Sequence, residues 1–226
     1  MNNRNLLRQC VAEGIGTFAL IFIGVGAIYN LGAIPGGLLG IALAHGLTIA
    51  VMVSATAGIS GGHLNPAVTF GLLVGGKIGL KDSVAYWVAQ LAGATAAGLL
   101  CVNLLGTAAV AGGTPDISTL NGVPVVSTCQ AIIIEAVLTF FLVFVVYGSA
   151  VDARAPKIGG LAIGLTVALD ILFGGPLTGA AMNPARTFGP ALASWHWNNH
   201  IVYWAGPMLG GLLAGLVYGR FLIREK

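Results

Sequence analysis

The sequence predicts an all-α membrane protein with six transmembrane helices and two re-entrant half-helices, arranged as an inverted repeat. Three observations support this fold class. The 226 residues are 57% hydrophobic and only 8% charged, a composition too apolar for a soluble domain of this length. The hydrophobic residues gather in six long runs. The tripeptide Asn-Pro-Ala occurs twice, and each copy begins an apolar stretch that is too short to cross a bilayer.

The six apolar runs supply the predicted membrane-spanning helices. They cover residues 11–31, 38–56, 84–105, 131–151, 158–173 and 201–219. A helix needs about 20 residues to cross the hydrocarbon core, and most runs are close to that length. The fifth run is the shortest, so the sequence defines its ends least well. We therefore expect six spans in a lipid bilayer.

Basic residues give the expected orientation, because Lys and Arg favour cytoplasmic loops. With both termini in the cytoplasm, nine of the ten basic residues fall on that side: Arg4, Arg8, Lys77, Lys81, Arg154, Lys157, Arg220, Arg224 and Lys226. The tenth, Arg186, falls on the opposite side, which favours a functional role for it. Topology thus accounts for the net charge of +3, and we expect no nucleic-acid partner.

The two tripeptides predict the starts of two half-helices. They comprise Asn65, Pro66 and Ala67, and Asn183, Pro184 and Ala185. Asn is a favourable N-cap, and Pro fits the first helical position, where its missing N–H costs nothing. The stretches 65–74 and 183–193 would each span roughly 15 Å, which is half of a core of about 30 Å. Two such helices would meet at the midplane, with positive dipole ends that repel cations and Asn amides that donate to water.

The two halves of the chain repeat each other, at about residues 6–107 and 128–222. The tripeptides are 118 positions apart, and Glu13 and Glu135 are each followed at the same distance by Thr-Phe. Tyr-Trp pairs recur at 86–87 and 203–204, and we expect the second pair to lie at the membrane surface. Because each half has three spans, the halves enter the membrane in opposite directions, an arrangement typical of a pathway at the midplane.

A carboxylate inside a span is costly unless it is satisfied, and no Lys or Arg lies within any run. We expect Glu13 and Glu135 to support the loops before the half-helices by accepting their hydrogen bonds. The alternative for Glu13 is that its side chain extends to the membrane surface.

Six spans, two inverted halves, paired Asn-Pro-Ala motifs and Arg186 just after the second motif resemble the aquaporin (major intrinsic protein) family over nearly the whole chain. The resemblance implies that residues 1–226 form a single transmembrane channel domain and that the protein is a homotetramer in which each protomer has its own pore. It also implies a ladder of pore carbonyls from two segments: Gly61, Gly62, His63 and Leu64, and Gly179, Ala180, Ala181 and Met182.

The resemblance further implies a selectivity filter, located by counting from the motifs: His45, Ile171, Ala180 and Arg186. This set is similar to the filters of plant vacuolar aquaporins and of ammonia-permeable animal ones. Ile171 and Ala180 remove bulk and polarity, while His45 and Arg186 retain hydrogen-bond donors. We therefore predict a passive channel for water and small neutral solutes, ammonia and hydrogen peroxide, that excludes protons and ions. The alternative for His45 is a core histidine bonded to a backbone carbonyl.

Asp170 does not belong to the filter pattern of the family. It either pairs with a donor at the rim, biasing His45 or Arg186, or reaches interfacial water, and we prefer the second interpretation.

Three other functions remain as alternatives. A glycerol or small-polyol facilitator is disfavoured because relatives of that type carry Asp where this chain has Thr187. An ion-coupled secondary transporter typically has more spans and paired charges within the membrane. A structural membrane protein with a closed pore would share the whole fold.

We expect no enzymatic activity, because no nucleophile, metal cluster or phosphate-binding loop is evident, and no cofactor or metal. Cys10, Cys101 and Cys129 are interpreted as packing residues. Short termini and loops favour a plasma (inner) membrane over a vacuolar one.

Overall fold

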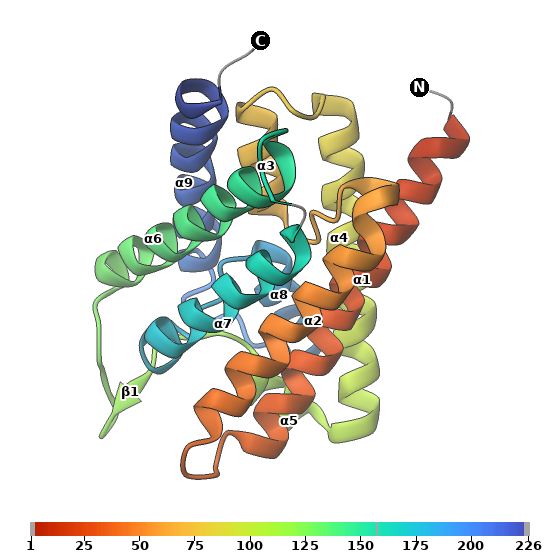
Figure 1. Ribbon diagram of the computed structural model, residues 1–226. Coiled ribbons are helices and arrows are strands. Elements are labelled where there is room, and N and C mark those ends of the chain that lie inside the picture. Colours follow the sequence, from red (N-terminus) through yellow and green to blue (C-terminus); the bar gives the residue numbers. More distant parts are fainter. Residues whose placement is uncertain (1–2, 157, 224–226) are drawn as a thin grey trace.

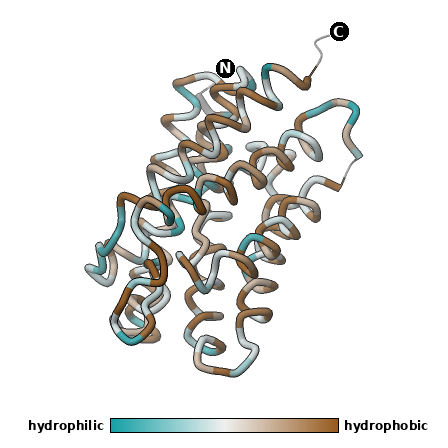
Figure 2. The backbone as a smooth tube through the Cα atoms, turned by 90° about the vertical axis from the view of Figure 1, so that its left-hand side faces the viewer, coloured by the Kyte–Doolittle hydropathy of each residue, from teal (hydrophilic) through white to brown (hydrophobic). Residues whose placement is uncertain are grey.

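Six long helices form the body of the protein in a computed structural model that describes residues 3–156 and 158–223, without the side chains of residues 3 and 4. The helices are α1 (Asn3–Leu31), α2 (Gly37–Ser60), α4 (Leu80–Leu105), α6 (Thr128–Val146), α7 (Gly159–Thr178) and α9 (Val202–Leu216). Two π-helical segments, η1 (Tyr147–Val151) and η2 (Val217–Leu222), continue α6 and α9. All six helices are long and apolar enough to cross a membrane, so the prediction of six spans is confirmed. Figure 2 shows the hydrophilic residues concentrated in the connections.

Two of the helices extend well beyond their apolar runs. Helix α1 begins eight residues before its run, in a polar segment that includes Arg8. Helix α7 continues five residues past Phe173 and contains Pro176, where the sequence suggested an end. Of the basic residues that predicted the orientation, Lys157, Arg224, Lys226 and the side chain of Arg4 lie outside the described part. Figure 1 shows that α1 begins and η2 ends at the same end of the molecule.

The half-helices are present where the tripeptides predicted them, as α3 (Pro66–Val74) and α8 (Pro184–Ser194). Asn65 caps α3 by accepting from the Ala67 N–H at 2.8 Å, and Asn183 caps α8 by accepting from the Ala185 N–H at 3.0 Å. Proline occupies the start of each helix, as expected. The predicted fold class is therefore confirmed, while the repeat boundaries stay a prediction.

Equivalent helix pairs of the two halves pack closely: α1 on α4, and α6 on α9. Helices α2 and α7, which come from different halves, also pack closely, and a glycine on each helix makes this possible. A Cβ at Gly46 would lie 2.5 Å from the Gly164 carbonyl oxygen, and one at Gly164 would lie 2.2 Å from the Gly46 oxygen. Small residues allow backbones to approach in this way, which matters in a membrane because lipid provides no hydrophobic driving force between helices.

The connection between the halves contains elements that the sequence analysis did not anticipate. A short helix, α5 (Thr107–Gly113), is followed by a hairpin of β1 (Thr119–Leu120) and β2 (Val123–Pro124), which projects away from the bundle in Figure 1. Its turn is Asn121-Gly122, with φ of 53° and 79° at the two residues. Asn-Gly is the favoured sequence of a two-residue hairpin turn, so the signal was present but the strands are too short to show periodicity.

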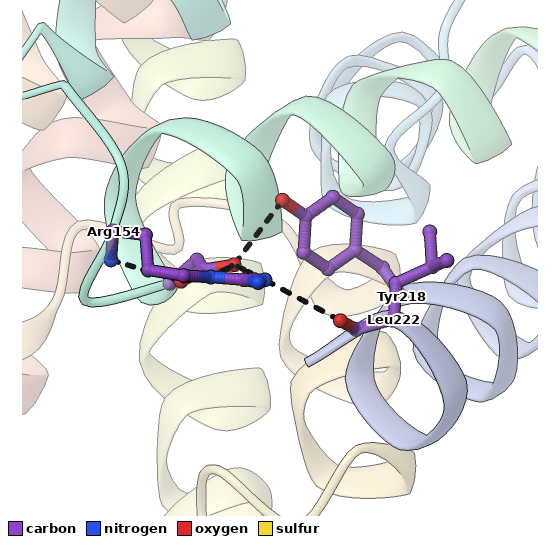
Figure 3. Close-up of polar contacts among 4 residues, drawn as sticks. Arg154, Tyr218 and Leu222 are labelled. Atoms are coloured by element: carbon purple, nitrogen blue, oxygen red, sulfur yellow. Dashed lines mark hydrogen bonds and ion pairs between the residues drawn. The ribbon is translucent and has the colours of Figure 1, made fainter. Parts of the chain in front are cut away.

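The end of the molecule that holds both termini has its own polar contacts (Figure 3). Arg154, in the loop after η1, pairs with Asp152 and donates to the Leu222 carbonyl oxygen at 3.3 Å. The Tyr218 hydroxyl donates to Asp152 Oδ2 at 3.4 Å. These contacts tie the loop between η1 and α7 to η2.

Candidate functional site

The two half-helices meet through reciprocal hydrogen bonds. Asn65 Nδ2 donates to the Met182 carbonyl oxygen at 2.9 Å, and Asn183 Nδ2 donates to the Leu64 carbonyl oxygen at 3.0 Å. Each Asn side chain caps its own half-helix with Oδ1 and contacts the other half of the chain with Nδ2. An amide nitrogen carries two hydrogens, so one donor of each Asn remains for a molecule in the cavity. The sequence had suggested that both hydrogens of each Asn amide would be free to donate to water.

The loops before the half-helices contain left-handed backbone at equivalent positions. Leu64 and Met182 both have φ of 51°, and Ala180 has φ of 44°. Non-glycine residues in this region cost of order 1–3 kcal/mol each, and they persist only where surrounding contacts fix them. The loops therefore need external support.

Glu13 and Glu135 provide that support, and both side chains are fully buried. Glu13 accepts hydrogen bonds from the N–H groups of His63 at 2.9 Å and Leu64 at 2.6 Å. Glu135 accepts from the N–H groups of Ala181 at 3.0 Å and Met182 at 2.7 Å. The hydrogen bonds expected of both carboxylates are thus present, and Glu13 does not extend to the membrane surface.

Hydroxyl groups complete this arrangement in both halves. Ser60 donates to Glu13 at 2.6 Å, and Thr178, 118 positions later, donates to Glu135 at 2.7 Å. Tyr86 and Tyr203 donate to the backbone oxygens of these two residues, each at 2.7 Å. Tyr203 is therefore completely buried and not at the membrane surface, which corrects the sequence-based expectation.

His45 and Arg186 of the predicted filter contact each other. His45 Nδ1 donates to the Ile41 carbonyl oxygen at 2.9 Å, which leaves Nε2 as an acceptor for Arg186 Nε at 3.4 Å. Arg186 Nη2 donates to the Gly113 carbonyl oxygen at 3.0 Å. Arg186 Nη1 is buried and has no partner among the described residues, so it is a free donor. His45 bonds a backbone carbonyl, as the alternative interpretation expected, and it also contacts Arg186; its part in a selectivity filter stays a prediction.

A glycine that the sequence analysis did not single out makes room for His45. A Cβ at Gly24 of α1 would lie only 2.4 Å from His45 Nε2. Contacts below 3.0 Å are not compatible with real side chains, so His45 could not keep its position beside any larger residue.

All four predicted filter residues line one narrow cavity of about 30 Å³, together with Asn65 and Asn183. That volume is sufficient to hold water. Of the predicted carbonyl ladder, Gly62, His63, Ala180, Ala181 and Met182 also line it. Gly61 and Leu64 are not part of this lining, and Gly179 lines the wider cavity described next. The ladder as a whole stays a prediction.

The wider cavity, of about 370 Å³, adjoins the narrow one and shares His45, Ile171 and Arg186 with it. These three residues therefore lie where a broad mouth meets a narrow passage. The remaining wall of the narrow cavity is apolar: Leu20, Ile49, Val53, Val68, Leu142, Val146, Ile163 and Val167. Hydrogen-bonding groups thus make up only part of the lining of this cavity.

Asp170 differs from what the sequence suggested. It is 5% exposed, and its Oδ2 has no partner among the residues that the structure describes. Because α7 continues to Thr178, Asp170 lies eight residues, or about 12 Å, from the helix end. The expectation that it reaches interfacial water is therefore wrong. It is also absent from the lining of both cavities.

Comparisons with known proteins agree with this geometry. A family model described as Major intrinsic protein matches residues 1–218. Probable aquaporin TIP3-2 of Arabidopsis thaliana is 45% identical over 233 residues, covering 96% of this chain and 84% of that protein. Aquaporin TIP2-1 of Zea mays is 46% identical over 227 residues, covering 96% and 88%. The X-ray structure of the aquaglyceroporin from Plasmodium falciparum matches with a TM-score of 0.83 at 26% identity, covering 96% of this chain and 97% of that one.

Proposed function

The chain belongs to the major intrinsic protein family, the aquaporins, and is a multi-pass membrane channel and not an enzyme; from this premise we propose that it conducts water, ammonia and hydrogen peroxide and excludes protons and ions. The observation that supports the solute range is the set of residues at the junction of the two cavities. His45 and Arg186 supply donors there, while Ile171 and Ala180 supply an apolar, uncrowded wall.

Proton exclusion follows from the junction of the half-helices. A water molecule there can accept from the remaining amide hydrogens of Asn65 and Asn183, which engages both of its lone pairs. Such a molecule cannot accept a proton from its neighbour, so the chain of waters is interrupted. The N-terminal ends of α3 and α8 and the Arg186 guanidinium add positive potential, which opposes any cation in the same place.

Ammonia fits the same passage as a neutral molecule. Its single lone pair can accept from Arg186 Nη1, and its N–H groups can donate to backbone oxygens such as that of Ala180. The Ile171 side chain offers no hydrogen bond at this part of the wall. A molecule slightly larger than water therefore needs no polar partner there in order to pass. Ammonium, in contrast, meets the full electrostatic barrier.

The test compares water and ammonia permeability in proteoliposomes. We expect His45→Phe with Ile171→His to lower ammonia flux more than water flux, because Phe is larger than His and the histidine then stands at position 171, where the filter otherwise has a hydrocarbon side chain. A matched control places the same residue types at the equivalent positions of the other half, as Ile163→Phe with Val53→His. We expect this control to lower both fluxes in proportion. Equal losses of both fluxes in the filter variant would refute the proposed role of these residues.

The same vesicles distinguish the alternatives. Glycerol flux well above that of bare lipid would favour a polyol facilitator; the matching Plasmodium structure is that of an aquaglyceroporin. Flux that follows an imposed ion gradient would favour a secondary transporter. Water flux no faster than that of bare lipid would indicate a closed pore.

Assembly, location and orientation are also proposals. We expect a homotetramer, which the mass of the detergent-solubilised protein would test, and cytoplasmic termini, which protease protection would test. Short loops favoured a plasma membrane, whereas similarity to plant TIP aquaporins favours a vacuolar one, so the choice of membrane depends on localising a tagged chain.

A further inference from the structure

A five-residue segment, 114–118, lies between α5 and β1 and forms part of the wall of the wider cavity; we call it the mouth loop. Its N-terminal neighbour, Gly113, provides the carbonyl oxygen that accepts from Arg186 Nη2. Its C-terminal end is fixed by Ser118, whose N–H donates to the Leu177 oxygen at 3.1 Å. Ile117 is buried against Val202 and Tyr203. The position of this loop therefore decides whether Arg186 has its carbonyl partner.

One carboxylate connects the mouth loop to the segment that follows α8. Asp116 Oδ2 lies 3.0 Å from His196 Nε2, and Asp116 Oδ1 accepts from Asn199 Nδ2 at 2.8 Å. His196 and Asn199 are 80 and 83 residues away in sequence. Asn199 itself has φ of 48°, an uncommon value for a non-glycine residue that needs fixing by its surroundings.

Asp116 is ionised at neutral pH. Burial raises the pKa of this carboxyl, but hydrogen bonds from Asn199, His196 and the Ile117 N–H outweigh that effect and bring the pKa below its ordinary value. A neutral His196 donates one hydrogen bond to it, and a protonated His196 adds an ionic attraction.

We propose that Asp116 is a positioning residue for the selectivity filter: by binding His196 and Asn199 it holds the mouth loop so that the Gly113 oxygen keeps Arg186 against the wall. The inference rests on the proposed function of the filter. If the loop moves away, Arg186 Nη2 loses its acceptor. The guanidinium, with Nη1 already unpaired, can then turn into a cavity of only about 30 Å³ and obstruct it.

The other titratable groups on the elements packed round this loop do not replace His196 as a partner of Asp116. His45 of α2 keeps Nε2 as the acceptor for Arg186 of α8, so a second positive charge there is opposed. Tyr203 of α9 donates its hydroxyl to the Thr178 oxygen. His200 accepts from Trp204 Nε1 at 3.0 Å, and burial lowers its pKa, so it stays neutral.

The experiment measures osmotic water permeability of proteoliposomes at neutral pH. We expect His196→Gln, which keeps a donor for Asp116, to conduct better than His196→Ala, which removes that donor. Asp116→Ala should conduct several-fold less than wild type, and Asp116→Asn, which keeps an acceptor for Asn199, should recover part of the loss.

A second background separates positioning from misfolding. If Asp116 acts through Arg186, then Asp116→Ala added to Arg186→Ala changes nothing further, since the group that would obstruct the cavity is gone. Asp82→Ala, in the first turn of α4 at the opposite end of that helix from α5, is the control and should keep the wild-type permeability. An equal loss from Asp116→Ala in both backgrounds, or a His196→Gln variant that conducts no better than His196→Ala, would overturn the inference. A wild type without water flux would instead overturn the proposed function.

Discussion

Each half of the chain has one junction, which is the loop before the half-helix together with the side chains that support it. The two junctions are built in the same way but differ in how completely their polar groups are hydrogen-bonded. Glu13 accepts four hydrogen bonds, the fourth from Gln90 Nε2 at 2.8 Å. Glu135 accepts three, because Pro207 occupies the position equivalent to Gln90 and has no donor. Thr69 contacts both Gln90 and His63, whereas the hydroxyl of the equivalent Thr187 has no partner among the described residues.

The two junctions also differ in the residue that stands three positions after the Asn of the motif. In the first half, Val68 stands at the position equivalent to Arg186, and the polar groups bond one another. In the second half, Arg186 lines the narrow cavity, its Nη1 has no partner among the described residues, and it is held by groups outside its own half, His45 and Gly113. The first junction is therefore the more completely hydrogen-bonded of the two, although Gln90 Oε1 also has no partner among the described residues.

The largest expected effect follows from the unequal hydrogen bonding of the two carboxylates. Glu13→Ala removes the acceptor of four hydrogen bonds and Glu135→Ala the acceptor of three, at about 1–3 kcal/mol for each buried donor that finds no other acceptor. We expect both variants to lower thermal stability severely in detergent, and Glu13→Ala to do so more. If Glu135→Ala were the less stable of the two, the first junction would not be the better supported.

A smaller effect is expected where α1 makes room for the filter. Gly24→Ala would force His45 away from Arg186, whereas Gly26→Ala is a matched control because a Cβ there meets nothing within 4 Å. We expect Gly24→Ala to change the ratio of ammonia to water permeability several-fold, although residue 24 is outside the filter. Val146 occupies the position equivalent to Gly24 and lines the cavity, as does Ile163, the equivalent of His45. Enlarging the cavity there by Val146→Ala should leave the ratio nearer to wild type. Similar ratios for the two glycine variants would show that the position of His45 is not decisive.

The smallest effect is expected at the end of the molecule that holds the termini. The Arg154 side chain is 60% exposed, so its pair with Asp152 should contribute little to stability. Hydrogen bonds from Arg154 bring the pKa of Asp152 below its ordinary value, so any stabilisation is present above the ordinary pKa and is lost only as the pH falls through the folded value. We expect Arg154→Ala to leave water permeability at its wild-type value, whereas Asp116→Ala should lower it several-fold. A loss from Arg154→Ala as large as that from Asp116→Ala would show that the mouth loop has no special effect on permeability.

Sequence alone determined the features that depend on local chemistry. Long apolar runs gave the six spans, Asn followed by Pro gave the starts of α3 and α8, and counting from the motifs gave four residues that line one cavity. An isolated carboxylate in an apolar run must find donors, which gave the roles of Glu13 and Glu135 in supporting the loops.

Tertiary structure decided the features that depend on contacts between distant segments. The partner of Arg186 is a backbone oxygen, and every residue has one, so no sequence pattern could point to Gly113. The burial of Asp170 and Tyr203 depends on where α7 ends and on which surface covers α9. The link from Asp116 to His196 joins two loops whose distance is set by the packing of the whole bundle, and short loops carry no periodicity from which that distance could be inferred.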